Sequence, residues 1–287
     1  MLGAMCATLC DPVATKCAEG AEAVSFPEDL EVHEMIPAAR RLRISQILKE
    51  RHAVRVSSLS EDLGVSEMTI RRDLERLESE GLLTRTHGGA VLKRHIAEEP
   101  LWVDRVVAQA EEKRRIAQAA AALIQPAETV FLSSGTTAAQ VLRYLPPDLE
   151  ARIITHNVGA VSEAQRMGIE VVLVGGVYNP RLNAVGGPTA VEDIGRYHAS
   201  KMLIGVDGFD LEEGLTTPTI DMASIERAMI KQTRGEVIVL ADNSKIGVVA
   251  DVVICGFDQV DVVMVDDGVD EAVRDEITRL GLRCMVV

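Results

Sequence analysis

Aromatic residues are scarce in this chain, at 3% of 287 residues. Proteins that bind single-stranded nucleic acid stack bases on Phe, Tyr and Trp, so this scarcity argues against such a platform. Long apolar runs are also missing: one of the longer ones, residues 171–177, has strand length, whereas a membrane span needs roughly 18 residues. The first eleven residues lack the basic and apolar regions of a secretory signal. We therefore expect a cytoplasmic protein with an aliphatic core.

Cysteine is also sparse, with five residues and no CxxC pair. Cys6, Cys10 and Cys17 lie close together, but no fourth ligand has a matching spacing for a metal site. We expect reduced thiols, no metal and no cofactor.

The net charge of −14 is unevenly distributed along the chain. Residues 1–38 carry −6, and residues 96–287 carry −12, but residues 39–95 hold twelve Lys and Arg against eight Asp and Glu, a net +4. At roughly 150 residues per domain, the length favours two domains. A small basic module joined to a large acidic one is the asymmetry expected when one end approaches nucleic-acid phosphates.

Residues 1–38 are acidic, contain three prolines and show no apolar periodicity, which predicts a disordered leader. An alternative interpretation is that translation starts at Met35, just before the first periodic segment. That segment, from Ala38, combines apolar positions with several arginines and predicts a basic amphipathic helix.

Residues 56–77 have the pattern of two helices around a tight turn at Gly64 to Ser66. Gly64 accepts the positive φ of the turn, and Ser66 is a natural N-cap for the second helix. The apolar stripe of that helix, Ile70, Leu74 and Leu77, leaves its first turns exposed, as in a recognition helix that enters the major groove. The predicted DNA contacts on it are Ser66, Met68, Thr69, Arg71 and Arg72.

Residues 81–92 predict a β-wing, with two short strands around Gly88-Gly89 and with Arg85 and His87 near its tip as further DNA contacts. The alternative for Arg71 and Arg72 is a solvated helix face paired with Asp73 and Glu75. We favour DNA contact because the turn, the cap, the apolar stripe and the basic wing agree. Residues 39–95 thus form a predicted winged helix-turn-helix domain.

Residues 96–110 are interpreted as a linker, and residues 111–287 as an α/β domain in which apolar runs of strand length alternate with helical segments. This alternation predicts a mostly parallel sheet with helices on both faces. Its predicted strands are 129–132, 152–155, 170–174, 201–205, 236–241, 252–255, 261–265 and 283–287. Ligands of such folds bind where the strands end at their carboxyl side.

Three predicted loops at that edge carry candidate ligand-binding side chains. The run Ser133, Ser134, Gly135, Thr136 and Thr137 follows a strand and opens a helix, which suits a phosphate or a plain helix cap equally well. In the other two loops, Asp207, before Gly208, can accept sugar hydroxyls, and Lys245 can neutralise a phosphate, although both can also be solvated loop residues. Weaker candidates are Thr155, Asn157, Gly175 and Gly176; the alternative role of the two glycines is to permit a turn.

The runs SEMTIRRDL and LESEGLLTRTHGGAVL resemble the winged helix-turn-helix signature of the DeoR family of bacterial transcriptional repressors. The likeness continues through EEKRRIAQAAAALI, SSGTT, GVDG, GLTT, ERAMI and LADNSKIG, over roughly residues 39–268. It implies an operator-binding N-terminal domain and a C-terminal domain similar in fold to ribose-phosphate isomerases, which senses a phosphorylated sugar or related metabolite. It also favours phosphate binding at residues 133–137.

This chain departs from the family pattern at three positions. Ser133 stands where members often have Asp, His156 where they have Asn, and Met222 where they have an acidic residue. A serine in place of the aspartate still donates and accepts but carries no charge, so the ligand contacts can differ. As a lone imidazole, His156 is more often structural than catalytic.

We expect a homo-oligomeric repressor of carbohydrate-metabolism genes that binds double-stranded operator DNA, leaves it when a phosphorylated sugar binds, and has no catalytic residues. An alternative is a sugar-phosphate isomerase with an appended DNA-binding domain, motivated by Asp207 and Lys245. The absence of a carboxylate at Ser133 and Met222 weakens the alternative. A protein-docking role for the basic helix is disfavoured by Arg71, Arg72 and the wing.

Overall fold

The computed structural model describes residues 35–146 and 148–287. Most of the predicted leader, with Cys6, Cys10 and Cys17, lies outside these residues. The predicted leader ended at residue 38, but the first helix already begins at Pro37, so the last two residues of that leader are helical. No helix of the described residues is both long and apolar enough to cross a membrane.

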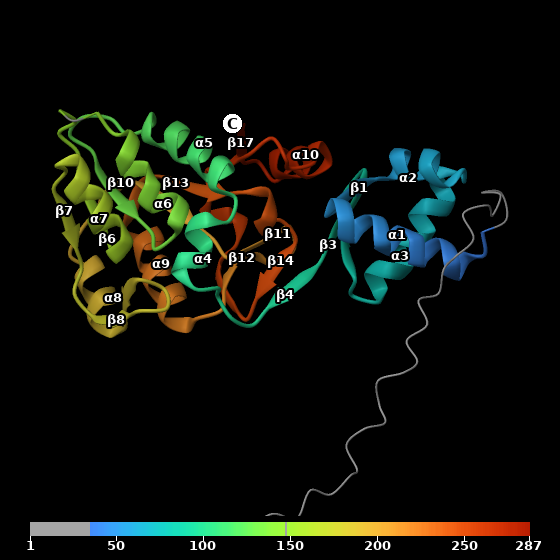
Figure 1. Cartoon of the computed structure of the whole chain (residues 1–287), viewed down its shortest axis with the longest axis horizontal. Helices are drawn as coiled ribbons and strands as arrows, with labels where there is room; N and C mark the ends of the chain where they lie inside the picture. Colours follow the sequence, from blue (N-terminus) through green and yellow to red (C-terminus); the bar gives the residue numbers. More distant parts are fainter. Residues whose placement is uncertain (1–34, 147) are drawn as a thin grey trace, which may run out of the picture. The chain divides into compact units, whose positions relative to one another are not determined.

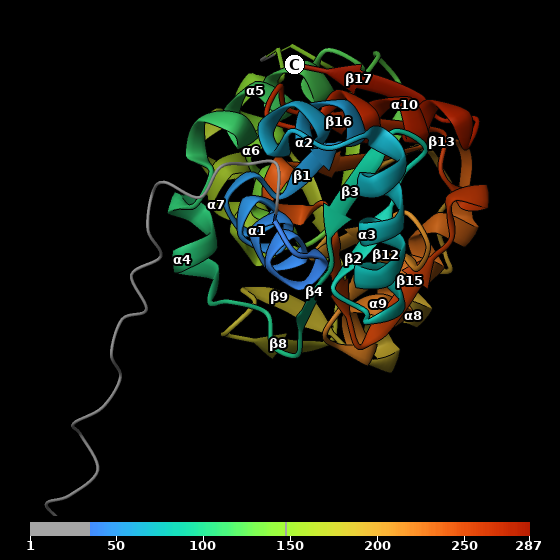
Figure 2. The ribbon, with the colours of Figure 1, turned by 90° about the vertical axis from the view of Figure 1, so that its right-hand side faces the viewer.

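The basic module, which is in the foreground of Figure 2, contains three helices and a three-stranded antiparallel sheet. Its elements are α1 (Pro37–Arg51), β1 (Ala53–Arg55), α2 (Val56–Leu63), α3 (Glu67–Ser79), β2 (Leu83–Arg85) and β3 (Gly89–Leu92). Leu59 and Leu63 of α2 and the stripe Ile70, Leu74 and Leu77 of α3 are at most 4% exposed and share one hydrophobic cluster. The predicted helix-turn-helix and wing are both formed.

Residues 96–110 contain more structure than the predicted linker. The short strand β4 (Arg94–Ile96) enters this segment, and the six-residue helix α4 (Trp102–Val107) lies within it. Strand β4 pairs in parallel with β14 (Val248–Ala250). The segment is therefore held against the C-terminal part of the chain.

The C-terminal part is built on a seven-stranded parallel sheet in the order β17-β16-β13-β10-β5-β6-β7. Figure 1 labels β6, β7, β10, β13 and β17 of this sheet. Its strands are β5 (Thr129–Leu132), β6 (Arg152–Thr155), β7 (Val171–Leu173), β10 (Ala199–Gly205), β13 (Thr233–Ala241), β16 (Val262–Val265) and β17 (Arg283–Val286). Along β5, Val130 and Leu132 join one hydrophobic cluster and Phe131 joins the other, so both faces of the sheet are covered.

Helices cover the sheet on both sides, as the alternating pattern predicts. One cluster contains residues of α5 (Ala110–Ala121), α6 (Thr136–Val141) and α7 (Val158–Met167). The other contains residues of α8 (Pro188–Ile194), α9 (Ile220–Gln232) and α10 (Glu271–Arg279). Three short 3-10 helices, η2 (Leu142–Tyr144), η3 (Asn243–Lys245) and η4 (Phe257–Gln259), lie in the connections.

One predicted strand belongs to a different sheet. Strand β15 (Val252–Cys255) has the predicted bounds but pairs antiparallel with β12 (Gly214–Thr217), which in turn pairs with β11 (Gly208–Asp210). A hairpin of β8 (Val177–Asn179) and β9 (Ala184–Gly186) was also not predicted. Strands β8 and β9 have three residues each, which is too short for the apolar alternation that predicts a strand from the sequence.

Candidate functional site

The recognition helix α3 begins as the sequence predicts. Gly64 has a φ of 60°, and the Ser66 side chain accepts a hydrogen bond from the backbone N–H of Thr69 at 3.3 Å. The cap fixes the start of the helix, and the buried stripe fixes its rotation. Met68, 55% exposed, and the exposed side chains of Arg71 and Arg72 are thus presented on its outer face.

The acidic partners proposed for a solvated arginine face are engaged elsewhere. Asp73 is 4% exposed and accepts from Arg40 of α1 at 2.5 Å, and Glu75 pairs with Arg85 of the wing at 3.1 Å. Arg71 instead pairs with Glu67, one turn earlier, at 2.8 Å. No hydrogen bond or ion pair of Arg72 occurs within residues 35–146 and 148–287. Such exposed pairs are weak, so Arg71 remains available to an external phosphate or base.

The two predicted DNA contacts of the wing differ in their exposure and in their partners. Arg85, predicted to contact DNA, is half-buried and pairs with Glu75 and, at 3.9 Å, with Glu78. His87, beyond the end of β2, is exposed. Arg85 therefore braces the wing against α3 in this structure, and His87 is the more accessible of the two predicted wing contacts.

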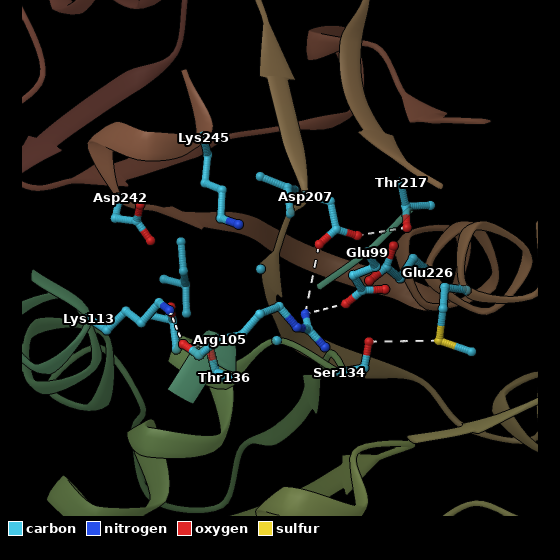
Figure 3. Close-up of a pocket in the computed structure, with 16 residues that line it drawn as sticks. Glu99, Arg105, Lys113, Ser134, Thr136, Asp207, Thr217, Glu226, Asp242 and Lys245 are labelled. Atoms are coloured by element: carbon cyan, nitrogen blue, oxygen red, sulfur yellow. Dashed lines mark hydrogen bonds and ion pairs between the residues drawn. The ribbon is translucent and has the colours of Figure 1, made fainter. Parts of the chain in front are cut away.

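A polar pocket lies at the carboxyl ends of β5, β10 and β13, where the parallel-sheet argument places ligand sites (Figure 3). Six predicted effector residues line it: Ser134, Gly135, Thr136, Thr137, Asp207 and Lys245. Space for water inside it is small, about 30 Å³.

Ser133, Thr155 and Asn157 lie behind the pocket and shape its loop. The Asn157 amide donates to the carbonyl oxygens of Ser133 and Gly135 at 3.0 and 3.1 Å. The Ser133 hydroxyl accepts from the Gly205 N–H at 2.8 Å, and the Thr155 hydroxyl donates to the Leu132 carbonyl at 2.7 Å. The structure places these three predicted effector residues as supports of the loop.

The predicted glycines Gly175, Gly176 and Gly208 do not line the pocket either. A Cβ on Gly176 would lie 2.5 Å from the Gly186 carbonyl oxygen, and one on Gly208 would lie 2.3 Å from the Thr216 hydroxyl. The Gly175 N–H donates to Asp193 at 3.0 Å. Close backbone packing accounts for Gly176 and Gly208.

His156 is a buried structural group. It is fully buried, its Nδ1 lies 3.2 Å from the Val185 carbonyl oxygen, and it does not line the pocket. Burial lowers the pKa of His156 to about 4, so the ring is neutral near pH 7. This agrees with the structural interpretation made from the sequence.

Two lysines supply positive charge on one side of the pocket. Lys245, in η3 after β13, was predicted, whereas Lys113 on α5 was not. Lys113 is 4% exposed, and its Nζ donates to the carbonyl oxygens of Arg105 and, at 2.7 Å, Ala108. Burial lowers the pKa of Lys113 to about 8, so it is mostly protonated at neutral pH. Helix α6 spans six residues, so the positive charge here depends mainly on these lysines.

Three carboxylates and an arginine occupy the other side. Arg105 of α4 pairs with Glu99, and its Nη1 lies 3.8 Å from Asp207. Asp207 also accepts from the Thr217 hydroxyl at 2.8 Å. Burial, reinforced by Asp207, raises the pKa of Glu99 to about 7. Burial also raises the pKa of Glu226 well above its ordinary value, with Asp207 and Glu99 adding to the shift.

Sequence reasoning missed five charged lining residues: Glu99, Arg105, Lys113, Glu226 and Asp242. A signal existed for two of them. Lys113 lies three residues before Ile116 on the buried face of α5, and Glu226 lies between Met222 and Met229 on the buried face of α9. A charge at a position with core periodicity indicates a polar cavity or a buried pair. Glu99 and Arg105 lie in the predicted linker, which gave no such signal.

Two family models match the chain. The model described as the DeoR-like helix-turn-helix domain matches residues 40–95, and the model described as the DeoR C terminal sensor domain matches residues 108–267.

Several curated proteins are similar over most of their length. The HTH-type transcriptional regulator GlpR of Haloferax volcanii is 34% identical over 248 residues, which cover 86% of this chain and 97% of that protein. The putative aga operon transcriptional repressor of Escherichia coli O157:H7 is 31% identical, with 86% and 93% covered. The HTH-type transcriptional repressor GlcR of Bacillus subtilis is 30% identical, with 88% and 97% covered.

Similarity to solved structures is weaker. Ribose 5-phosphate isomerase A of Methanocaldococcus jannaschii is 19% identical, with a TM-score of 0.37 over 48% of this chain and 55% of that one. The sorbitol operon regulator SorC of Klebsiella pneumoniae is 16% identical, with a TM-score of 0.33 over 71% and 89%. Similarities this low carry no argument about function.

Proposed function

The chain belongs to the DeoR family of transcriptional regulators, and we propose that it represses carbohydrate-metabolism genes and leaves its operator when a phosphorylated sugar or related metabolite binds. The observation that carries this proposal is one pocket with Lys113, Lys245 and Asp242 on one side and Arg105, Glu99, Asp207 and Glu226 on the other (Figure 3). Relatives whose names call them repressors, such as GlcR, support the direction of control.

The lysine side of the pocket suits a phosphate. Lys113 and Lys245 line this side together with Thr136 (Figure 3), and the hydroxyls of Ser134 and Thr137 line other parts of the pocket. A dianionic phosphate accepts hydrogen bonds from ammonium and hydroxyl groups alike. The carboxylates of Asp207 and Glu99 on the opposite side suit the hydroxyl groups of a sugar.

Arg105 is the residue through which we expect ligand binding in the pocket to affect the DNA-binding domain. Its guanidinium occupies the pocket, and its helix α4 lies in the segment that joins the two domains along the chain. Because Arg105 reaches into the pocket between its two sides, we propose that a bound sugar phosphate shifts its side chain. A ligand changes operator affinity only if it binds the DNA-bound and DNA-free arrangements differently, and a displaced α4 supplies such a difference.

Operator recognition requires more than one copy of the chain. A single recognition helix reads few base pairs, so we propose at least a dimer, with half-sites about 10 bp apart or a multiple of that spacing. The C-terminal domain is the larger surface for this association. Analytical ultracentrifugation with and without operator DNA measures the number of subunits.

The effector proposal is tested by operator affinity with and without a panel of sugar phosphates. We expect at least one ester to weaken operator binding by the wild type, and Lys245→Ala to need a higher ester concentration for the same effect. Lys231→Ala, a change at an exposed lysine of α9, is the matched control. An equal response of Lys245→Ala and wild type at every concentration would contradict the phosphate contact. If no ester shifts the wild type, the effector is of another class.

The alternative enzymatic function has a specific motivation in the pocket. Asp207, Glu226 and Lys245 line it together, and an isomerase needs a carboxylate base and an electrophile near the sugar carbon. We propose a non-enzymatic role, because the curated relatives are named as regulators. The purified protein is therefore expected not to convert ribose 5-phosphate to ribulose 5-phosphate. Conversion by the wild type that Asp207→Asn abolishes would establish the enzyme instead.

A further inference from the structure

Two buried side chains of the pocket have polar atoms without a hydrogen-bond partner. They are Nε and Nη2 of Arg105 and Oε2 of Glu226. Arg105 is 8% exposed and Glu226 is 4% exposed, so water satisfies these atoms poorly. Buried polar groups are nearly always hydrogen-bonded, and an exception inside a pocket points to a missing ligand.

The two residues belong to the same end of the pocket. Figure 3 shows Glu226 on the side of Arg105 where Glu99 and Thr217 lie, with Lys113, Asp242 and Lys245 on the opposite side. The charge of Arg105 acts on Glu226, although no ion pair joins the two side chains in the described part of the chain. The unpartnered atoms are thus separate from the lysine side proposed for phosphate.

The chemistry of these atoms decides which ligand group fits. Arg105 offers N–H donors, and the Glu226 carboxyl accepts when it is ionised and both donates and accepts when it is protonated. A group that itself accepts and donates therefore satisfies both side chains in either protonation state of Glu226. A phosphate only accepts and an ammonium only donates, whereas a hydroxyl does both. Because burial raises the pKa of Glu226, its carboxyl attracts a cation less than an exposed carboxylate would.

We propose that Arg105 and Glu226 form a second subsite of the effector pocket, which binds a hydroxyl at the unphosphorylated end of a polyhydroxylated phosphate ester. This inference rests on the proposed function, since it assigns the end of the ligand opposite the phosphate. It makes the pocket selective for sugar or polyol phosphates over amino-sugar phosphates. Glu226 is the specificity-determining residue.

Isothermal titration calorimetry of the full chain tests the subsite. The probes are ribose 5-phosphate, fructose 6-phosphate, glucose 6-phosphate, glucosamine 6-phosphate, inorganic phosphate, and the unphosphorylated polyols ribitol and sorbitol. We expect at least one hydroxylated ester to bind the wild type more tightly than inorganic phosphate. Glucosamine 6-phosphate is expected to bind more weakly than glucose 6-phosphate.

Two substitutions of Glu226 distinguish the loss of a ligand contact from a loss of folding. Glu226→Leu removes the acceptor, and we expect about 10- to 100-fold weaker binding of the ester with unchanged affinity for inorganic phosphate. Glu226→Gln keeps a group that donates and accepts, and is expected to retain most of the affinity. Replacing a buried carboxyl by leucine should not lower the melting temperature. The measured melting temperature therefore checks that the variant folds. Asp221→Asn, an exposed change on α9, is the matched control.

Other outcomes overturn the subsite. Glu226→Leu that binds the ester like the wild type, or that loses ester and inorganic phosphate equally, contradicts it. Tighter binding of glucosamine 6-phosphate, lost in Glu226→Leu, would show an ammonium site. One further outcome separates the two proposals. If a polyol binds, Glu226→Leu abolishes its binding and no phosphate compound binds, the phosphate proposal fails and the subsite stands. If none of the probes binds, both fail.

Discussion

The Asn157 side chain, at the start of α7, donates to the Ser133 carbonyl oxygen at 3.0 Å across 24 positions of the sequence. The same amide donates to Gly135, and its Oδ1 caps α7 by accepting from the Ala160 N–H at 3.2 Å. One buried side chain thereby fixes both the pocket loop and the next helix. Asn157 therefore shapes the pocket through the backbone of the loop that its side chain holds in place.

Replacing Asn157 is therefore expected to destabilise the protein. Asn157→Ala removes the cap and leaves two buried carbonyl oxygens with fewer donors, at a cost of about 2–4 kcal/mol. Asn157→Asp retains the cap but sets carboxylate oxygen against carbonyl oxygen, so it should also destabilise. Urea unfolding measures both. If Asn157→Asp is as stable as the wild type, the amide does not hold the loop.

The recognition helix yields a prediction about DNA binding. Arg71→Ala and Arg72→Ala are each expected to cost about 1–3 kcal/mol of operator affinity if the arginine contacts a base. Gel shifts at fixed salt measure the change. Arg76→Ala is the control, because Arg76 pairs with Glu80 in the last turn of the same helix at 2.9 Å. Unchanged affinity in the double variant Arg71→Ala/Arg72→Ala would mean that α3 does not enter the groove.

Glu99 is expected to make the protein less stable as the pH rises. Its pKa is about 7 in the folded protein against an ordinary 4.5, so the folded state retains a proton that the unfolded state releases between these values. The free energy of unfolding should fall over this window by up to about 3 kcal/mol.

Urea unfolding at a series of pH values checks this dependence. Glu99→Gln should remove the part of the pH dependence between pH 4.5 and 7 that Glu99 contributes, because the amide does not titrate. Glu98→Gln changes the exposed neighbouring carboxyl and should leave the profile as in the wild type. Profiles of Glu99→Gln and the wild type with the same shape over this window would contradict the assignment.

Removal of residues 1–34 is expected to leave thermal stability and operator affinity unchanged. The segment offers neither a periodic apolar face nor a matched set of metal ligands. Thermal melts and gel shifts of the truncated chain measure both. A marked loss of either would show that this acidic segment packs on the protein or regulates it.

The sequence alone determined the elements whose signals are local. The Ser66 cap, the Gly64 turn and the stripe Ile70, Leu74 and Leu77 are set by spacings of three to seven residues, and the structure confirms each. Strands of the parallel sheet such as Thr129–Leu132 were predicted for the same reason, since their side chains are apolar on both faces.

Only the tertiary structure decided which charged groups meet. Asp207 lies more than one hundred positions after Glu99 and Arg105, and the structure brings the three side chains together. No local periodicity in the sequence predicts such a long-range contact. The same limit applies to β15, whose bounds were predicted but whose sheet was not, because pairing depends on contacts made by distant strands. The loop residues Ser134 to Thr137 were predicted to bind a ligand and do line the pocket, but burial and long-range ion pairs determine the charges around it.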